Sequence, residues 1–99
     1  MDLQELVTRC TGFEWDQGNL LKNWERHGVS DAEREQVFFN LPLLLQPDAS
    51  HSRKEERMVA LGQTDGGRAL FVVFTVRGDL VRIISARDMN RKERRQYQP

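Results

Sequence analysis

The stretch that decides the fold is RALFVVFTVRGDLVRIISA, residues 68–86. Two runs rich in Val, Ile and Phe are joined by Gly78 and Asp79, a pairing typical of a tight hairpin turn. The residues from Leu70 to Phe74 are apolar on both faces, which predicts a central strand covered by helices on at least one side. A further strand-like run, Arg57–Thr64, precedes the turn residues 65–67, so the sequence predicts an antiparallel meander.

Shorter strands and helices are predicted on the N-terminal side of this meander. Leu43–Gln46 is a brief apolar run closed by Pro47, and Phe13–Trp15 is a second short strand. Between them, we expect a helix from Asp16 to His27, stopped by Gly28. A second helix opens with Ser30 and Glu33 as a capping box, carries an apolar side of Val37, Phe38 and Leu41, and ends at Pro42.

The two ends of the chain are predicted to be helical. Leu3 to Arg9 carries an apolar stripe at helical spacing, which also includes Cys10. Asn90 and Glu93 cap a last, basic helix that reaches Tyr97. The 99 residues therefore form a single domain of α+β class, with helices packed on a small antiparallel sheet. The first helix looks like an N-terminal extension added to this domain, over residues 1–12.

Charge is divided unevenly along the chain, although fifteen basic and fifteen acidic side chains cancel overall. Residues 1–36 hold four basic and eight acidic groups, whereas residues 37–99 hold eleven and seven. The excess of arginine and lysine lies near the C-terminus, and such a patch suits a polyanion. The same residues, taken alone, also fit the solvated face of a helix.

Several classes of site find little support in the sequence. Cys10 lies on an apolar stripe and has no second cysteine to pair with, which favours a buried thiol and a reducing cytoplasm. His27 and His51 are far apart and lack further ligands at metal spacing, and His27 fits a helix C-terminus. The glycines follow turn spacing rather than that of a phosphate loop. We therefore expect no metal and no cofactor.

Two groups of polar residues remain as candidates for chemistry. His51 stands in a loop with Glu55 and Arg57, just before a strand, where an imidazole, carboxylates and guanidinium groups can converge. Strand alternation places Arg77 beside Thr75 and Arg87 beside Ser85, so polar groups are expected to collect at strand ends near the basic helix. Arginine holds a phosphodiester through its planar fork of donors, so these groups favour phosphate chemistry. Surface ion pairs are the simpler alternative for each group.

The residues also resemble the BrnT family of toxins. The resemblance covers Phe13 to about Tyr97, and residues 1–12 lie outside it. Its most specific parts are the spacing from Trp15 and Asp16 to His27 and Gly28 and the ending Ile84–Arg87. The full set is Phe13–Asp16, Asn23, Arg26–Val29, Val37, Phe38, His51, Ser52, Glu56, Arg57, Gly67, Arg68, Val73–Thr75 and Ile84–Arg87.

This resemblance implies a RelE-like fold and a metal-independent ribonuclease that cleaves messenger RNA. It also implies a ribbon-helix-helix antitoxin of the BrnA type as partner, with promoter DNA bound only through the complex. Cleavage without metal needs a base, an acid and cations around phosphorus. We expect the base to be His51 or Glu55 and the transition-state cations to be Arg57, Arg77 and Arg87. The RNA-binding candidates are Arg91, Lys92, Arg94, Arg95 and Tyr97, and Arg91, Lys92 or Tyr97 could alternatively donate the proton to the leaving oxygen.

A second hypothesis comes from another class of protein. The same basic surface could bind nucleic acid, or only a partner protein, without cleaving anything. The presence of a His, Glu and Arg set favours an enzyme.

Overall fold

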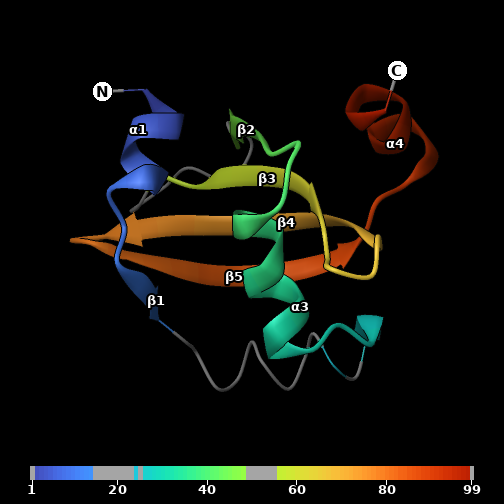
Figure 1. The fold of residues 1–99 in the computed structure, drawn as a ribbon, viewed down its shortest axis with the longest axis horizontal. Coiled ribbons are helices and arrows are strands. Elements are labelled where there is room, and N and C mark those ends of the chain that lie inside the picture. The colour runs from blue at the N-terminus through green and yellow to red at the C-terminus, as the bar shows by residue number, and fades with distance from the viewer. Residues whose placement is uncertain (1, 15–23, 25, 49–55, 99) are drawn as a thin grey trace.

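The protein forms one five-stranded sheet with short helices around it (Figure 1). The computed structural model describes residues 2–14, 24, 26–48 and 56–98. The strands are β1 (Gly12–Glu14), β2 (Leu44–Pro47), β3 (Met58–Gln63), β4 (Ala69–Arg77) and β5 (Leu80–Asp88). The helical elements are α1 (Leu3–Thr8), α3 (Asp31–Gln36), the 3-10 turn η1 (Val37–Phe39) and α4 (Arg91–Tyr97).

The strand order is β1-β5-β4-β3-β2, so β4 is the central strand, as its two apolar faces predict. Strands β2 to β5 pair antiparallel in sequence order, which confirms the meander. The prediction of a fully antiparallel sheet is wrong at one edge, because β1 pairs with β5 in parallel, with Gly12 opposite Leu80. Alternation in a three-residue strand indicates its faces but carries no signal for its direction.

The two faces of the sheet belong to different hydrophobic clusters. Leu70, Val72 and Phe74 of β4 join the larger cluster, which includes Val29 and Val37 from the segments on one face. We call this the helix face, and Figure 1 shows α3 and η1 crossing it. The alternate residues of β4 belong to a smaller cluster with Met89 and Tyr97. This second face is the α4 face, because α4 covers one end of it.

The pairing of β4 with β5 contains a β-bulge that changes which side chains of β5 lie on each face of the sheet. Val73 is opposite Ser85 and Phe74 is opposite Ile83, so Ile84 has no partner across the ladder. Such a β-bulge adds one residue to one strand and shifts its alternation. As a result Arg82, Ser85 and Arg87 all lie on the α4 face, in spite of the odd spacing between the first two.

Both capping boxes that the sequence predicts are present. Ser30 and Glu33 form a capping box at α3, and Asn90 and Glu93 form one at α4. The expected helix through Leu41 is too long, however. Regular α-helix ends at Gln36, and after the 3-10 turn Leu41 lies outside any helix with 83% of its surface exposed.

The helix predicted from Asp16 to His27 lies mainly outside the described residues. Trp24, Arg26 and His27 are helical, and the Gly28 amide donates to the Trp24 carbonyl at 3.0 Å. Gly28 has φ 59°, a conformation that favours glycine and ends the helix as predicted. Trp24 is 62% exposed, so the described residues do not bury this part of the apolar stripe.

Arg68, just before β4, ties this turn to the sheet. Its guanidinium donates to the carbonyls of His27 and Gly28, each at 2.9 Å, and to both carboxylate oxygens of Asp88. It also pairs with Glu33 at 3.2 Å. One side chain thus connects the Gly28 turn, α3 and the end of β5, and its fork of donors is what allows several acceptors at once.

The N-terminal helix packs on the helix face through its predicted stripe. Leu3, Leu6, Val7 and Cys10 are partly buried against the larger cluster. Burial raises the pKa of the Cys10 thiol, and its Sγ donates to the Leu6 carbonyl. A raised pKa keeps a thiol protonated and unreactive, which agrees with the structural role expected for this cysteine.

Gly62 of β3 marks the closest approach of η1 to the sheet. A Cβ added at this position would lie 2.5 Å from Val37 Cγ1 and 3.2 Å from the Val37 carbonyl oxygen. We therefore expect Gly62→Ala to lower the free energy of unfolding by about 1–3 kcal/mol, the usual cost of overpacking a core. Urea unfolding measures this change.

The matched control is Gly66→Ala in the turn before β4. A Cβ there would meet only Thr64 Oγ1, at 3.9 Å. This variant should be neutral, or more stable by up to about 1 kcal/mol, because alanine restricts the unfolded chain. Equal stability of the two variants would contradict the close approach of η1.

Candidate nucleic-acid site

A row of polar residues crosses the α4 face near the β4–β5 turn. The strand registers place Glu14 beside Arg82 and Arg82 beside Thr75. Met58 pairs with Phe74, so Arg57, one residue earlier, continues the row at the level of Thr75. Neighbouring strands lie about 4.8 Å apart, so the four positions span about 15 Å.

Two arginines converge on the carboxylate at one end of this row. Glu14 Oε1 lies 3.2 Å from Arg82 Nη1 and 3.8 Å from Arg77 Nη1. Arg77, the last residue of β4, is the more exposed of the two arginines, with 45% of its side chain accessible against 19% for Arg82. The group is accessible to a ligand from the α4 face.

The other end of the row is fixed by backbone contacts. The Asp48 amide donates to the Arg57 carbonyl at 2.9 Å, and Thr75 Oγ1 donates to the Glu56 carbonyl at 2.8 Å. Arg57 itself is half-buried. His51 and Glu55, predicted as acid–base groups, lie outside the described residues, so their roles stay predictions.

Arg87 lies at the opposite end of the same face. Its two terminal nitrogens donate to Glu93 Oε1 and Oε2 at 2.8 and 2.9 Å, and its guanidinium carbon is 4.0 Å from the centre of the Phe71 ring. The paired hydrogen bonds raise the pKa of Arg87 and lower the pKa of Glu93. Arg87 is thus held by a bidentate ion pair and a ring contact.

The expected gathering of Arg77 and Arg87 at strand ends near the basic helix is wrong. Antiparallel pairing places Arg87 opposite Phe71, six residues before Arg77 on β4. At about 3.4 Å per residue the two backbones are about 20 Å apart. Figure 1 shows this separation, with the β4–β5 turn at one end of the sheet and α4 at the other. The structure therefore groups Arg77 with Arg57 and Arg82, away from Arg87.

The basic residues of α4 lie beyond Arg87. Arg91, Lys92, Arg94 and Arg95 are all exposed, as expected of groups that could contact phosphates. Tyr97, the fifth candidate, is buried, and its hydroxyl donates to the Pro42 carbonyl. This bond and the hydrogen bond from Gln96 to Gln46 attach α4 to the β2 side of the sheet.

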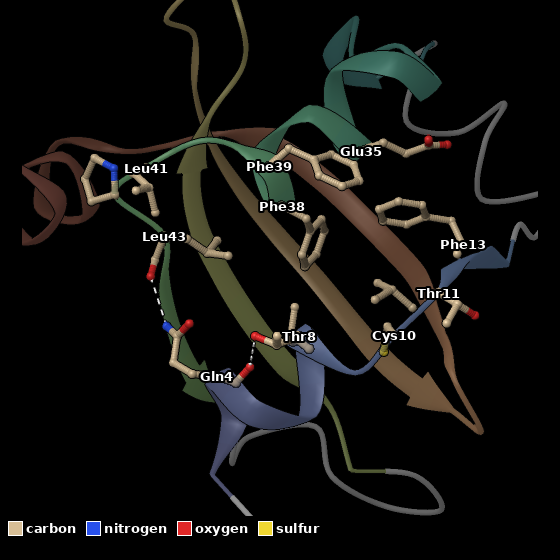
Figure 2. Close-up of a pocket in the computed structure, with 14 residues that line it drawn as sticks. Gln4, Thr8, Cys10, Thr11, Phe13, Glu35, Phe38, Phe39, Leu41 and Leu43 are labelled. Atoms are coloured by element: carbon tan, nitrogen blue, oxygen red, sulfur yellow. Dashed lines mark hydrogen bonds between the residues drawn. The ribbon is translucent and has the colours of Figure 1, made fainter.

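The helix face carries a hollow that is lined mainly by uncharged side chains (Figure 2). Its volume is about 970 Å³, and it lies between α1, η1 and the start of β2. The rings of Phe13, Phe38 and Phe39 border it, with ring centres 5.6 and 6.0 Å apart for the pairs that include Phe13. Glu35 is the charged residue among those that line it. Phosphate chemistry needs cations, so the α4 face is the better candidate for a nucleic-acid site.

Sequence analysis missed Glu14 and Arg82. Both lie in strands whose apolar residues carried the prediction, and their proximity depends on the parallel pairing of β1 with β5. The available signal was alternation, which places Glu14 on the face opposite to the core residue Phe13. The partner strand was not predictable from that signal.

Residues 2–14, 24, 26–48 and 56–98 include no group of three or more His, Cys, Asp or Glu placed to hold a metal ion. Among the same residues, no helix has the length and apolar character needed to cross a membrane.

Comparisons with known proteins identify relatives of the fold and sequence. Residues 15–93 match the sequence model of a family described as ribonuclease toxin, BrnT, of type II toxin–antitoxin system. The crystal structure of the Brucella abortus ribonuclease toxin BrnT superposes with a TM-score of 0.62 at 23% identity. The match covers 82% of this chain and 99% of that one. No curated protein sequence matches the chain.

The ion pairs at the ends of the strands make stability dependent on acid pH. Hydrogen bonds from Arg87 and Arg68 lower the pKa of Glu93 and of Asp88 below their ordinary values of 4.5 and 3.8. Carboxylates with a lowered pKa stabilise the fold above their unfolded pKa, and this contribution is lost as pH falls through the folded pKa. We expect the free energy of unfolding to decrease progressively below about pH 5.

Urea titrations between pH 7 and pH 3 measure this dependence. Glu93→Gln should reduce its slope, since glutamine does not titrate. Glu5→Gln, on the exposed surface of α1, is the control and should retain the slope. The explanation fails if stability is flat across this range.

Proposed function

The chain belongs to the family of BrnT ribonuclease toxins of type II toxin–antitoxin systems, and we propose that it cleaves messenger RNA without a metal ion, through the ribose 2′-hydroxyl. The observation that carries this proposal is the grouping of Arg57, Arg77 and Arg82 at one end of an accessible strand face. An RNA strand lying across this face would bring one phosphodiester to these guanidinium groups.

The arginines are suited to the charge that develops in this reaction. Attack of the 2′-oxygen on phosphorus adds negative charge to the non-bridging oxygens, and fixed guanidinium donors stabilise that charge. The Arg77 side chain is more accessible than that of Arg82, so we assign Arg77 to the scissile phosphate. His51 and Glu55 stay predicted acid–base groups.

Arg87 receives a different role in this proposal. Its guanidinium is held against Phe71 by Glu93, about 20 Å along the strand from Arg77 by the usual strand rise. One phosphate group does not span that separation. We therefore assign Arg87, with the exposed basic residues of α4, to binding of the RNA backbone away from the cleaved bond.

A type II toxin implies an antitoxin, and we propose one of the BrnA type with a ribbon-helix-helix domain. A basic, arginine-lined face is blocked most directly by an acidic or amphipathic segment of that partner. Promoter DNA would then be bound through the antitoxin in the complex. The second candidate function, a non-catalytic module that binds nucleic acid or protein through the same face, is an outcome of the experiments below.

We expect the purified chain to convert a short RNA into fragments with a 2′,3′-cyclic phosphate and a 5′-hydroxyl. The activity should persist in a chelator, and an oligonucleotide with 2′-deoxyribose should survive, since the nucleophile is then missing. Arg77→Ala should lower kcat by about 10² to 10³, the cost of losing one charge-stabilising donor. Arg87→Ala should chiefly weaken RNA binding.

Mass spectrometry of the fragments and single-turnover kinetics measure these effects. RNA binding without cleavage by the unmodified chain would favour the binding module. Equal losses of kcat in Arg77→Ala and Arg87→Ala would instead indicate that Arg87 also acts on the reacting phosphate.

The α4 residues give a separate test of the binding surface. We expect Arg94→Ala with Arg95→Ala to weaken RNA binding and to flatten its dependence on salt, because each contact to a phosphate releases about 0.7 of a counterion from a single strand. Fluorescence anisotropy with labelled RNA between 50 and 300 mM salt measures the slope. Arg9→Ala, at the end of α1, is the control and should leave the slope unchanged. An unchanged slope in the α4 variant would show that this helix does not contact the RNA.

A further inference from the structure

We propose that Glu14 is the general base of the cleavage reaction and that Arg82 holds the phosphate beside Arg77. This inference rests on the proposed ribonuclease function and gives Glu14 the role of base that the sequence predicts for His51 or Glu55. It follows from three observations about the α4 face: the pairing of Glu14 with two arginines, the state of its second oxygen, and the engagement of the neighbouring carboxylate.

The first observation is that a carboxylate and two guanidinium groups occupy one spot. β1, β4 and β5 each contribute one of them, and the same oxygen, Glu14 Oε1, faces both Arg77 and Arg82. A phosphate drawn to these cations lies next to the carboxylate. Because strands hold all three residues, the spacing between base and cations is set by the sheet.

The second observation concerns the other oxygen. Within the described residues no hydrogen bond reaches Glu14 Oε2, whereas Oε1 accepts from Arg82. The side chain is 35% exposed, so a substrate hydroxyl can approach the carboxylate. One oxygen is thus oriented by the cations and the other is available for a proton.

The third observation is that Glu93, the carboxylate at the far end of the α4 face, is already engaged and so is a poor candidate for the general base. Glu93 gives both of its oxygens to Arg87, and Oε1 also accepts from the Asn90 amide at 2.9 Å. It is only 15% exposed. Of these two carboxylates, Glu14 is the more exposed, and it lies beside the exposed Arg77.

The proposed chemical step needs no reactant other than the RNA and water. Glu14 Oε2 takes the proton of the 2′-hydroxyl while the 2′-oxygen forms a bond to phosphorus. The bond from phosphorus to the 5′-oxygen breaks, leaving a 2′,3′-cyclic phosphate, and the departing 5′-oxygen takes a proton from solvent water. Arg77 and Arg82 donate to the non-bridging oxygens throughout. Glu14 afterwards returns its proton to solvent.

The test compares Glu14→Gln and Glu14→Asp with the unmodified chain in single-turnover cleavage of a short RNA, with RNA affinity measured separately by fluorescence anisotropy. Glutamine cannot accept the proton, so we expect a loss of about 10² to 10⁴ in the cleavage rate. RNA affinity should stay equal or increase, because a negative charge beside the phosphate is removed. Aspartate keeps the carboxylate and should cleave faster than glutamine, at a rate below that of the unmodified chain.

Glu5→Gln, on α1, is the control and should leave the cleavage rate and the RNA affinity unchanged. Thermal unfolding of each variant shows whether it is folded. A rate loss in Glu55→Gln or His51→Ala as large as that expected for Glu14→Gln would assign the base to that residue and overturn the inference. A folded Glu14→Gln chain that cleaves within about threefold of the original rate would overturn it too. If Glu14→Gln does not fold, an unchanged rate in a folded Glu14→Asp chain would overturn the inference, because the shorter side chain moves the base away from the 2′-hydroxyl. An unmodified chain that cleaves no RNA would overturn the proposed function itself.

Discussion

The pairing of β4 with β5 is the constraint on which the rest of the structure depends. These two nine-residue strands form the centre of the sheet, and every other strand is placed by hydrogen bonding to one of them or to β3. Their register determines which side chains enter the core and which face the opposite side. It also fixes the distance between Arg77 and Arg87, which no side-chain movement can remove.

The two faces divide the physical tasks of a small domain. The helix face buries the larger cluster and its aromatic rings, which provides most of the apolar burial available to a chain of this size. The α4 face has a smaller cluster under one helix and leaves room for charged side chains beyond it. Arginines can occupy that face because their stems cover apolar neighbours while the guanidinium groups keep contact with solvent and carboxylates.

Much of the fold is predictable from local sequence. The hairpin turns, the order of the strands from β2 to β5, the capping boxes of α3 and α4 and the stop at Gly28 all follow from residues next to one another in the chain. The errors involve distant partners. The direction of β1 and the length of the helix before Leu41 depend on tertiary contacts, which residue spacing does not encode.

The candidate site was predictable only in part for the same reason. Residue type singled out Arg57 and Arg77, which do lie at one end of the sheet. Arg87 was added because strand alternation describes faces and says nothing about which end of an antiparallel pair a residue occupies. Glu14 and Arg82 needed the parallel register of β1 before their proximity could be seen.

The bulge at Ile84 has a consequence for how this strand can change length in evolution. A one-residue insertion or deletion in a paired strand normally inverts every following side chain, so that core residues meet solvent. Here Arg82 and Ser85 already lie on the same face with one supernumerary residue between them. Loss of that residue would leave a regular ladder with Ile83 and Ala86 still in the core. Evolution can therefore shorten β5 by one residue at Ile84 without exchanging the side chains that face the core with those that face the opposite side.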